Sequence, residues 1–110
     1  MDFTEFRQSL KAEHPPRGLP APLRALWHEA RGNWDRAHQI VQSEDGQAAA
    51  RVHAYLHRRE GDLSNADYWY SRAGAERPRG PLEKEWESLV GSLLDENLTA
   101  KTRRREGNAK

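Results

Sequence analysis

This chain contains no cysteine among its 110 residues. The absence excludes a disulfide framework, a Cys-ligated zinc site and a thiol nucleophile. Long apolar runs are also missing: hydrophobic residues make up only 35% of the chain, and no stretch approaches the roughly 18 apolar residues of a membrane span. The opening residues include the acidic Asp2 and lead into no apolar run, so they do not resemble a secretory signal. We therefore expect a cytoplasmic protein that does not enter a membrane.

Enzyme signatures are equally scarce. The sequence has no Gly-rich phosphate-binding loop, no nucleophile elbow and no dinucleotide-binding fingerprint. Its serines stand in no recognisable motif. These absences favour a protein that is not an enzyme, and we expect no cofactor.

Charge of one sign does not dominate, since the formal net charge is +1. The distribution is uneven: residues 101–110 carry five basic groups and one acidic group, so the other hundred residues sum to −3. A nucleic-acid binder would place its positive charge on a folded face. We therefore expect no specific nucleic-acid partner, and a basic, disordered tail over residues 98–110.

The sequence does contain apolar residues at the spacing of an α-helix. Residues 2–11 suit a short helix, in which Asp2 and Glu5 have the spacing of a capping box. Four prolines within residues 14–22 predict an extended connector. Apolar residues then recur every three or four positions as far as a last helix over residues 81–95. The pattern predicts an all-α protein with a single domain over residues 1–97.

The middle of the chain repeats itself with a period of 29 residues. Each unit has a glycine followed by a small polar residue, and an alanine five residues after that glycine: Gly32-Asn33 with Ala37, and Gly61-Asp62 with Ala66. Such a glycine ends one helix, and the polar residue caps the next. Repetition of a helix–turn–helix unit predicts two successive helical hairpins, over about 21–49 and 50–78.

The run Gly61-Asp62-Leu63-x-x-Ala66-x-x-x-Tyr70-x-x-Ala73-x-x-x-x-Pro78 resembles the second half of a tetratricopeptide motif. Residues 32–44 are a weaker copy, with Glu44 where the second alanine is expected. In the first helix of each unit only the small residues match. The resemblance implies two divergent tetratricopeptide-like hairpins, flanked by an N-terminal helix and a C-terminal capping helix.

In that family the first helices line a concave groove that binds extended peptides. Carried over by position, this groove would present Arg51, Tyr55 and Arg58. Guanidinium groups offer forked donors for a carboxylate, so an acidic peptide would suit them. Our leading prediction is therefore a small protein- or peptide-interaction module.

The histidines are the most unusual feature of the sequence. His53 and His57 lie four residues apart on one helical face, a spacing that can chelate a metal ion, and Glu60 follows one turn later. A specific metal site needs three or four converging ligands, and no further cluster in the sequence completes the set. We therefore expect these two histidines to pack between helices, bonded to carboxylates or carbonyls, with no metal centre. His38 occupies the position in the first unit that Asp67 occupies in the second. We expect the two side chains to form a surface ion pair across the hairpins.

The run Tyr68-Trp69-Tyr70 cannot face one core, because three consecutive residues spread over roughly 200° of a helix. Tyr68 is expected to cover a cleft or be exposed, and Trp34 either closes the same cleft or holds its hairpin together.

The alternative function is a small-molecule or metal-binding protein, enzymes included, that uses the histidine, tyrosine and tryptophan side chains of the two hairpins. Self-association also stays open. The candidate binding residues are Arg51, Tyr55, Arg58, Trp34, His38, His53, His57 and Tyr68.

Overall fold

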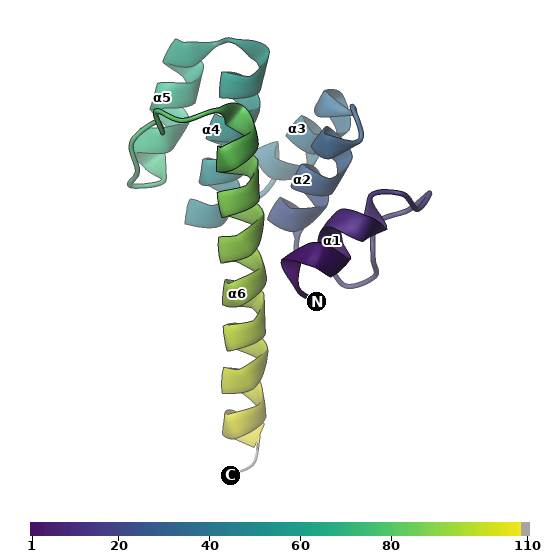
Figure 1. Cartoon of the computed structure of the whole chain (residues 1–110). Helices are drawn as coiled ribbons and strands as arrows, with labels where there is room; N and C mark the ends of the chain where they lie inside the picture. The colour runs from purple at the N-terminus through teal and green to yellow at the C-terminus, as the bar shows by residue number, and fades with distance from the viewer. Residues whose placement is uncertain (109–110) are drawn as a thin grey trace.

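The computed structural model describes the backbone of residues 1–108 and the side chains of residues 1–97. Within residues 1–108 it contains six helices and no strand, which confirms the all-α class (Figure 1). The helices are α1 (Phe3–Ser9), α2 (Ala21–Ala30), α3 (Trp34–Gln42), α4 (Gln47–Glu60), α5 (Leu63–Arg72) and α6 (Leu82–Asn108).

Two helical hairpins form the body of the molecule, as predicted. Helices α2 and α3 pack together, α4 and α5 pack together, and α4 also contacts α2 and α3, so the hairpins stack. Helix α6 lies against α2 and α4, and α1 packs against α6 (Figure 1). The two added helices thus bury surface that two hairpins alone would expose to water.

The hairpin turns have the same chemistry in both units. Gly32 and Gly61 adopt φ of 84° and 90°, a left-handed conformation that costs glycine little because it has no Cβ. The next residue, Asn33 or Asp62, donates its backbone N–H to a carbonyl of the preceding helix. Its side chain then accepts from the third residue of the following helix. One Gly-polar pair therefore ends a helix and starts the next.

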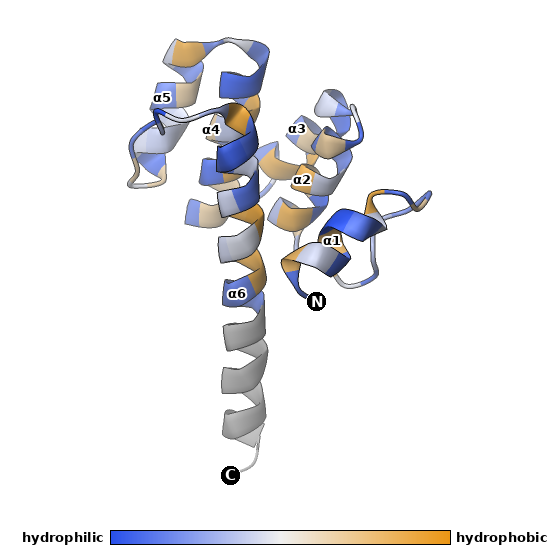
Figure 2. Ribbon diagram, viewed as in Figure 1, coloured by the Kyte–Doolittle hydropathy of each residue, from blue (hydrophilic) through white to orange (hydrophobic). Residues whose placement is uncertain are grey.

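The core lies between the hairpins and α6. Ala37 and Ala66 are both fully buried, so the small residue at this repeat position allows close helix packing. Trp27 from α2, Leu56 from α4 and Leu89 from α6 are buried in one cluster. Figure 2 shows the hydrophobic residues of α6 on the side turned toward α1 and α2. The apolar stripe of the last helix therefore faces the core.

Element boundaries differ from the predictions. Helix α1 is shorter than 2–11, although the capping box of Asp2 and Glu5 is present. Helix α4 begins at Gln47, before the expected unit boundary at 50, and α6 runs through Asn108 rather than ending near 95. The basic, disordered tail predicted over residues 98–110 stays a prediction, because the side chains of residues 98–110 and the backbone of residues 109–110 lie outside the described part of the chain.

Among the residues described, no helix combines the length and the apolar character needed to cross a membrane. The cytoplasmic location stays a prediction.

Candidate metal centre

Three imidazole rings converge where α3 crosses α4. His38 comes from α3, and His53 and His57 come from α4. One ring nitrogen from each lies within 4.8 Å of the other two. The Nε2 atoms of His38 and His53 are 3.0 Å apart. We call these three residues the imidazole cluster.

Local helix geometry places two of the three rings. His53 and His57 are one turn apart on α4, so their rings lie over one another, with centroids 4.9 Å apart and planes at 25°. The contact between α3 and α4 supplies the third ring. His38 meets His53 edge-on, at 82° and 4.7 Å between centroids.

A carboxylate orients the ring of His57. The Nδ1 atom of His57 lies 2.6 Å from an oxygen of Glu60. An ionised carboxylate only accepts hydrogen bonds, so Nδ1 carries a proton, and in the neutral imidazole Nε2 then keeps its lone pair. Metal-ligating histidines commonly have this arrangement, because the carboxylate fixes the tautomer and makes the ligand nitrogen more basic.

Two tryptophans enclose the cluster. The Trp34 ring stacks on His38 at 4.9 Å and 8°, and the Trp69 ring stacks on His53 at 3.9 Å and 14°. The indole N–H of Trp34 donates to the carbonyl of Leu56 over 2.7 Å, which fixes the position of that ring. His53 and His57 are only 5% and 6% exposed as a result, while His38 is half-buried.

The electrostatics favour the neutral form of two of the rings, His38 and His53. Burial, and then the neighbouring imidazoles of His38 and His57, lower the pKa of His53 to about 4. Burial and the charge of His57 lower the pKa of His38 as well. Neutral imidazole is the form that binds a metal ion, so protons compete little with an ion at His38 and His53 at pH 7.

One nitrogen–nitrogen distance in the cluster is close to that of a coordination sphere. Two imidazole nitrogens bound to tetrahedral zinc at about 2.0–2.1 Å lie about 3.3 Å apart. The Nε2 atoms of His38 and His53 already lie at 3.0 Å. The cluster as a whole keeps its three nitrogens within 4.8 Å, so side-chain rotation must bring the His57 nitrogen closer and replace the hydrogen bond between His38 and His53 with bonds to one ion.

The structure corrects three expectations about these histidines. The third converging nitrogen that sequence reasoning did not find is that of His38. His57 does bond to a carboxylate, but His53 contacts His38 and no carboxylate. The expected pair of His38 with Asp67 is wrong, since Asp67 instead forms an ion pair with Arg77 at 3.2 Å.

The remaining aromatic candidate lies at the edge of the cluster. Tyr68 is 53% exposed, and its hydroxyl accepts a hydrogen bond from Arg72 over 3.2 Å. Its ring meets Trp69 edge-on at 5.3 Å. The structure therefore connects Tyr68 to the imidazole cluster only through Trp69.

The three groove candidates lie on another side of α4. Tyr55 is 2% exposed, and Arg58 forms an ion pair with the buried Glu85 of α6 at 2.8 Å. Arg51 is half-buried beside the residues that follow α5. Helix α6 thus occupies the surface where the resemblance places a peptide, and the binding of a partner by these residues stays a prediction.

Sequence reasoning did not include Trp69 among the site residues. The signal was present in the aromatic run at 68–70, but the stacking on His53 depends on how α5 packs against α4.

No protein-family model, curated protein or solved structure matches this chain.

Proposed function

We propose that this protein binds a divalent transition-metal ion through His38, His53 and His57. The observation that carries the proposal is the convergence of three ring nitrogens within 4.8 Å. Imidazole suits zinc, copper, nickel and iron. Three protein ligands leave a fourth position to water or to another ligand.

The surroundings of the cluster support this function. Glu60 presents the Nε2 atom of His57, and stacking on Trp34 and Trp69 holds the other two rings in place. Preorganised rings lower the entropic cost of binding. The lowered pKa values of His38 and His53 favour the neutral imidazoles that bind an ion, and the ion would replace the hydrogen bond between their Nε2 atoms.

Titration with Zn²⁺ followed by calorimetry, and with Co²⁺ followed by visible absorption, tests the proposal. We expect one ion per chain and an absorption spectrum of tetrahedral Co²⁺.

His38→Gln is the informative variant, because His38 is half-buried and its loss leaves the core intact. His28→Gln is the matched control: His28 is the repeat equivalent of His57 but lies outside the cluster. Equal metal binding by both variants would contradict the proposal.

A protein-interaction function is the second candidate, and one observation favours it. Leu63 and Tyr68 on α5 are 45% and 53% exposed, and among the helices of the described chain α5 has substantial contacts with α4 alone. Within this proposal the two hairpins are divergent tetratricopeptide-like units, supported by their common turn chemistry. A pull-down that returns the same proteins with intact protein and with Tyr68→Ser would count against it.

A further inference from the structure

The helix at one end of the repeat lacks a neighbour that its equivalent has. Within the chain, α3 of the first hairpin packs against α4 of the second. Helix α5 is the repeat equivalent of α3, because the period is 29 residues. Among the described residues, α5 packs closely against α4 alone, and the following helix, α6, lies along α2 and α4 instead. The outer side of α5 is therefore without the helix that α4 provides for α3.

This outer side of α5 carries an apolar and an acidic side chain. Leu63 is 45% exposed and is the repeat equivalent of Trp34, which donates a hydrogen bond to α4. Asp67 is also exposed and is the equivalent of His38, whose ring lies against α4. Two positions that meet the next hairpin in the first unit are thus uncovered in the second. We call Leu63 and Asp67 the tail surface.

Asp67 can accept a second cation. Its ion pair with Arg77 at 3.2 Å joins side chains that are 51% and 36% exposed. Exposed ion pairs of this kind contribute little. A carboxylate also has about four lone-pair positions, so a second guanidinium can bind Asp67 beside the first.

A basic surface lies at the other end of the stacked hairpins, on α2. The two positions equivalent to the cluster histidines of α4 are Arg24 and His28, and both side chains are half-buried. Burial, and then the charges of Arg36, Arg24 and Arg31, lower the pKa of His28. Three guanidinium groups therefore lie near this ring. We call Arg24 and His28 the head surface.

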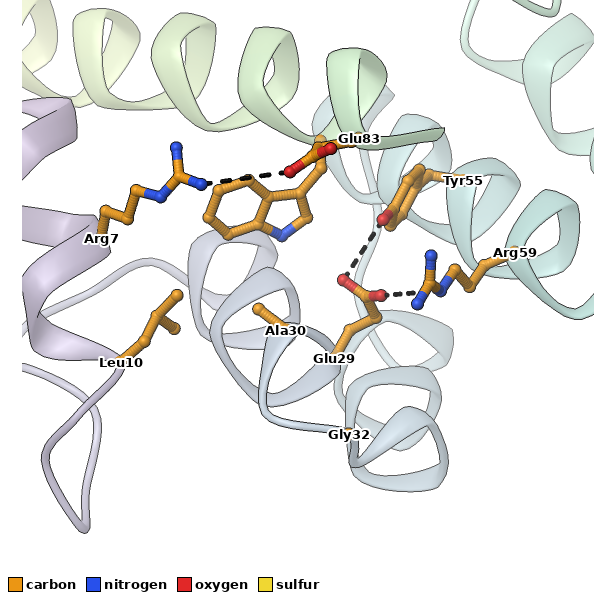
Figure 3. A pocket seen from close by; sticks show the side chains of 9 residues that line it. Arg7, Leu10, Glu29, Ala30, Gly32, Tyr55, Arg59 and Glu83 are labelled. Atoms are coloured by element: carbon orange, nitrogen blue, oxygen red, sulfur yellow. Dashed lines mark hydrogen bonds and ion pairs between the residues drawn. The ribbon is translucent and has the colours of Figure 1, made fainter. Parts of the chain in front are cut away.

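Helices α1 and α6 cover a different side of α2. They face α2 and α4 across a cavity lined by Glu29 and Tyr55, whose side chains point toward one another in Figure 3. Arg24 comes five residues before Glu29, which places it about 140° away around the helix. Its bond to the carbonyl of Leu19 uses one of the five donors of a guanidinium. The head surface can therefore meet a second molecule.

We propose that copies of this chain associate head to tail, with the tail surface of one copy against the head surface of the next. The contact repeats the packing of α3 on α4 within the chain. Asp67 takes the place of His38, and its carboxylate pairs with Arg24 of the next copy. Opposite charges on the two surfaces favour a second copy as the partner. Because the two surfaces differ, each added copy leaves one head and one tail free, and the assembly extends.

This contact is separate from both candidate functions. It needs no metal ion, so its test includes a chelator. It also makes no use of Tyr68, because the equivalent residue of the first hairpin, Gln39, stays exposed although α3 packs against α4. Tyr68→Ser should therefore leave self-association unchanged, even if it removes the binding of another protein.

Sedimentation equilibrium from about 10 µM to about 1 mM protein, a range suited to weak association, tests the proposal. The average mass of the wild type should rise with concentration beyond that of a dimer. Asp67→Arg and Arg24→Glu should each weaken the association at least about tenfold, since each brings like charges together. Asp45→Arg is the matched control, because it makes the same charge change at an exposed position outside both surfaces.

Combining the two substitutions exchanges the charges of the two surfaces and should restore association. If the doubly substituted chain does not fold, an equimolar mixture of the single variants gives the same test, because the tail of each variant then meets an opposite charge on the head of the other. Asp67 is exposed, so Asp67→Arg stays informative even if Arg24→Glu unfolds. A wild type that stays monomeric, a mass that stops at the dimer, or equal association of Asp67→Arg and Asp45→Arg would each overturn the proposal.

Discussion

At the scale of single residues, His57 has two roles in the candidate centre. Its Nδ1 atom donates to Glu60 over 2.6 Å, and in the neutral imidazole this leaves the lone pair of Nε2 for the cluster. The spacing of His53 and His57 was readable from the sequence, because four residues make one helical turn. The sequence did not predict that His38 joins these two histidines, because its distance from His53 depends on how α3 crosses α4.

Replacing Glu60 tests the positioning of this ring. Glu60→Gln should weaken metal affinity about 10- to 100-fold, because the amide no longer fixes the His57 tautomer as a carboxylate does. Competition titration against a chelator measures the change. Glu44→Gln serves as the control with the same charge change, and an affinity equal in the two variants would contradict the role of Glu60.

A second prediction at this scale concerns Glu29. Burial raises the pKa of Glu29, while Arg59 and Tyr55 partly offset that effect. The folded state therefore holds the proton more tightly than the unfolded chain, and Glu29 makes stability fall as pH rises above its unfolded pKa of about 4.5.

Glu29→Gln removes this titration. The stability of the variant relative to the wild type should therefore increase between pH 4 and pH 7. Urea unfolding at pH 4, 5.5 and 7 measures the difference in unfolding free energy. A difference that stays constant, or that moves the other way, would show that the fold does not raise the pKa of Glu29.

At the scale of elements, the hairpin turns were the most predictable feature. A glycine in the left-handed region and a polar N-cap are local requirements, and the pairs Gly32-Asn33 and Gly61-Asp62 satisfy both in sequence. The end of α6 was much harder to predict. Beyond Leu94 no apolar stripe marks the helix, although Lys, Arg and Glu are all good helix formers.

Two glycine substitutions test this difference between turn and helix. Gly61→Ala should destabilise the protein by about 1 kcal/mol, because φ is 90° at this position and a Cβ is strained there. Gly91→Ala should stabilise it by about 0.5–1 kcal/mol, since Gly91 is within α6 and an added Cβ meets nothing within 4 Å. Chemical denaturation of both variants gives the comparison, and effects of the same sign would contradict it.

At the scale of the whole molecule, α6 decides which surfaces are available. It packs along α2 and α4, and the buried Glu85 accepts hydrogen bonds from Arg58 of α4 and Tyr70 of α5. The family resemblance predicts the hairpins but not this coverage, because the position of a capping helix depends on contacts between residues far apart in sequence, such as the bond from Trp86 to Leu26. The imidazole cluster lies on a side of α4 that α6 leaves open.

Metal binding should couple to the stability of the whole fold, since one ion would connect the first hairpin to the second. At a free metal concentration of 100 times Kd, the gain is about 2.7 kcal/mol, or roughly 10 °C in Tm for a domain of this size. Differential scanning calorimetry with and without Zn²⁺ measures it. The His28→Gln control should show the same increase, and His38→Gln should lose most of it.

The most direct measurement is anomalous X-ray scattering at the zinc edge, from crystals grown with Zn²⁺. We predict one strong peak at about 2.0–2.1 Å from a ring nitrogen of each of His38, His53 and His57, the usual zinc–nitrogen distance. Crystals in which zinc binds elsewhere, while the Nε2 atoms of His38 and His53 keep their direct contact, would show that the cluster is only a packing arrangement.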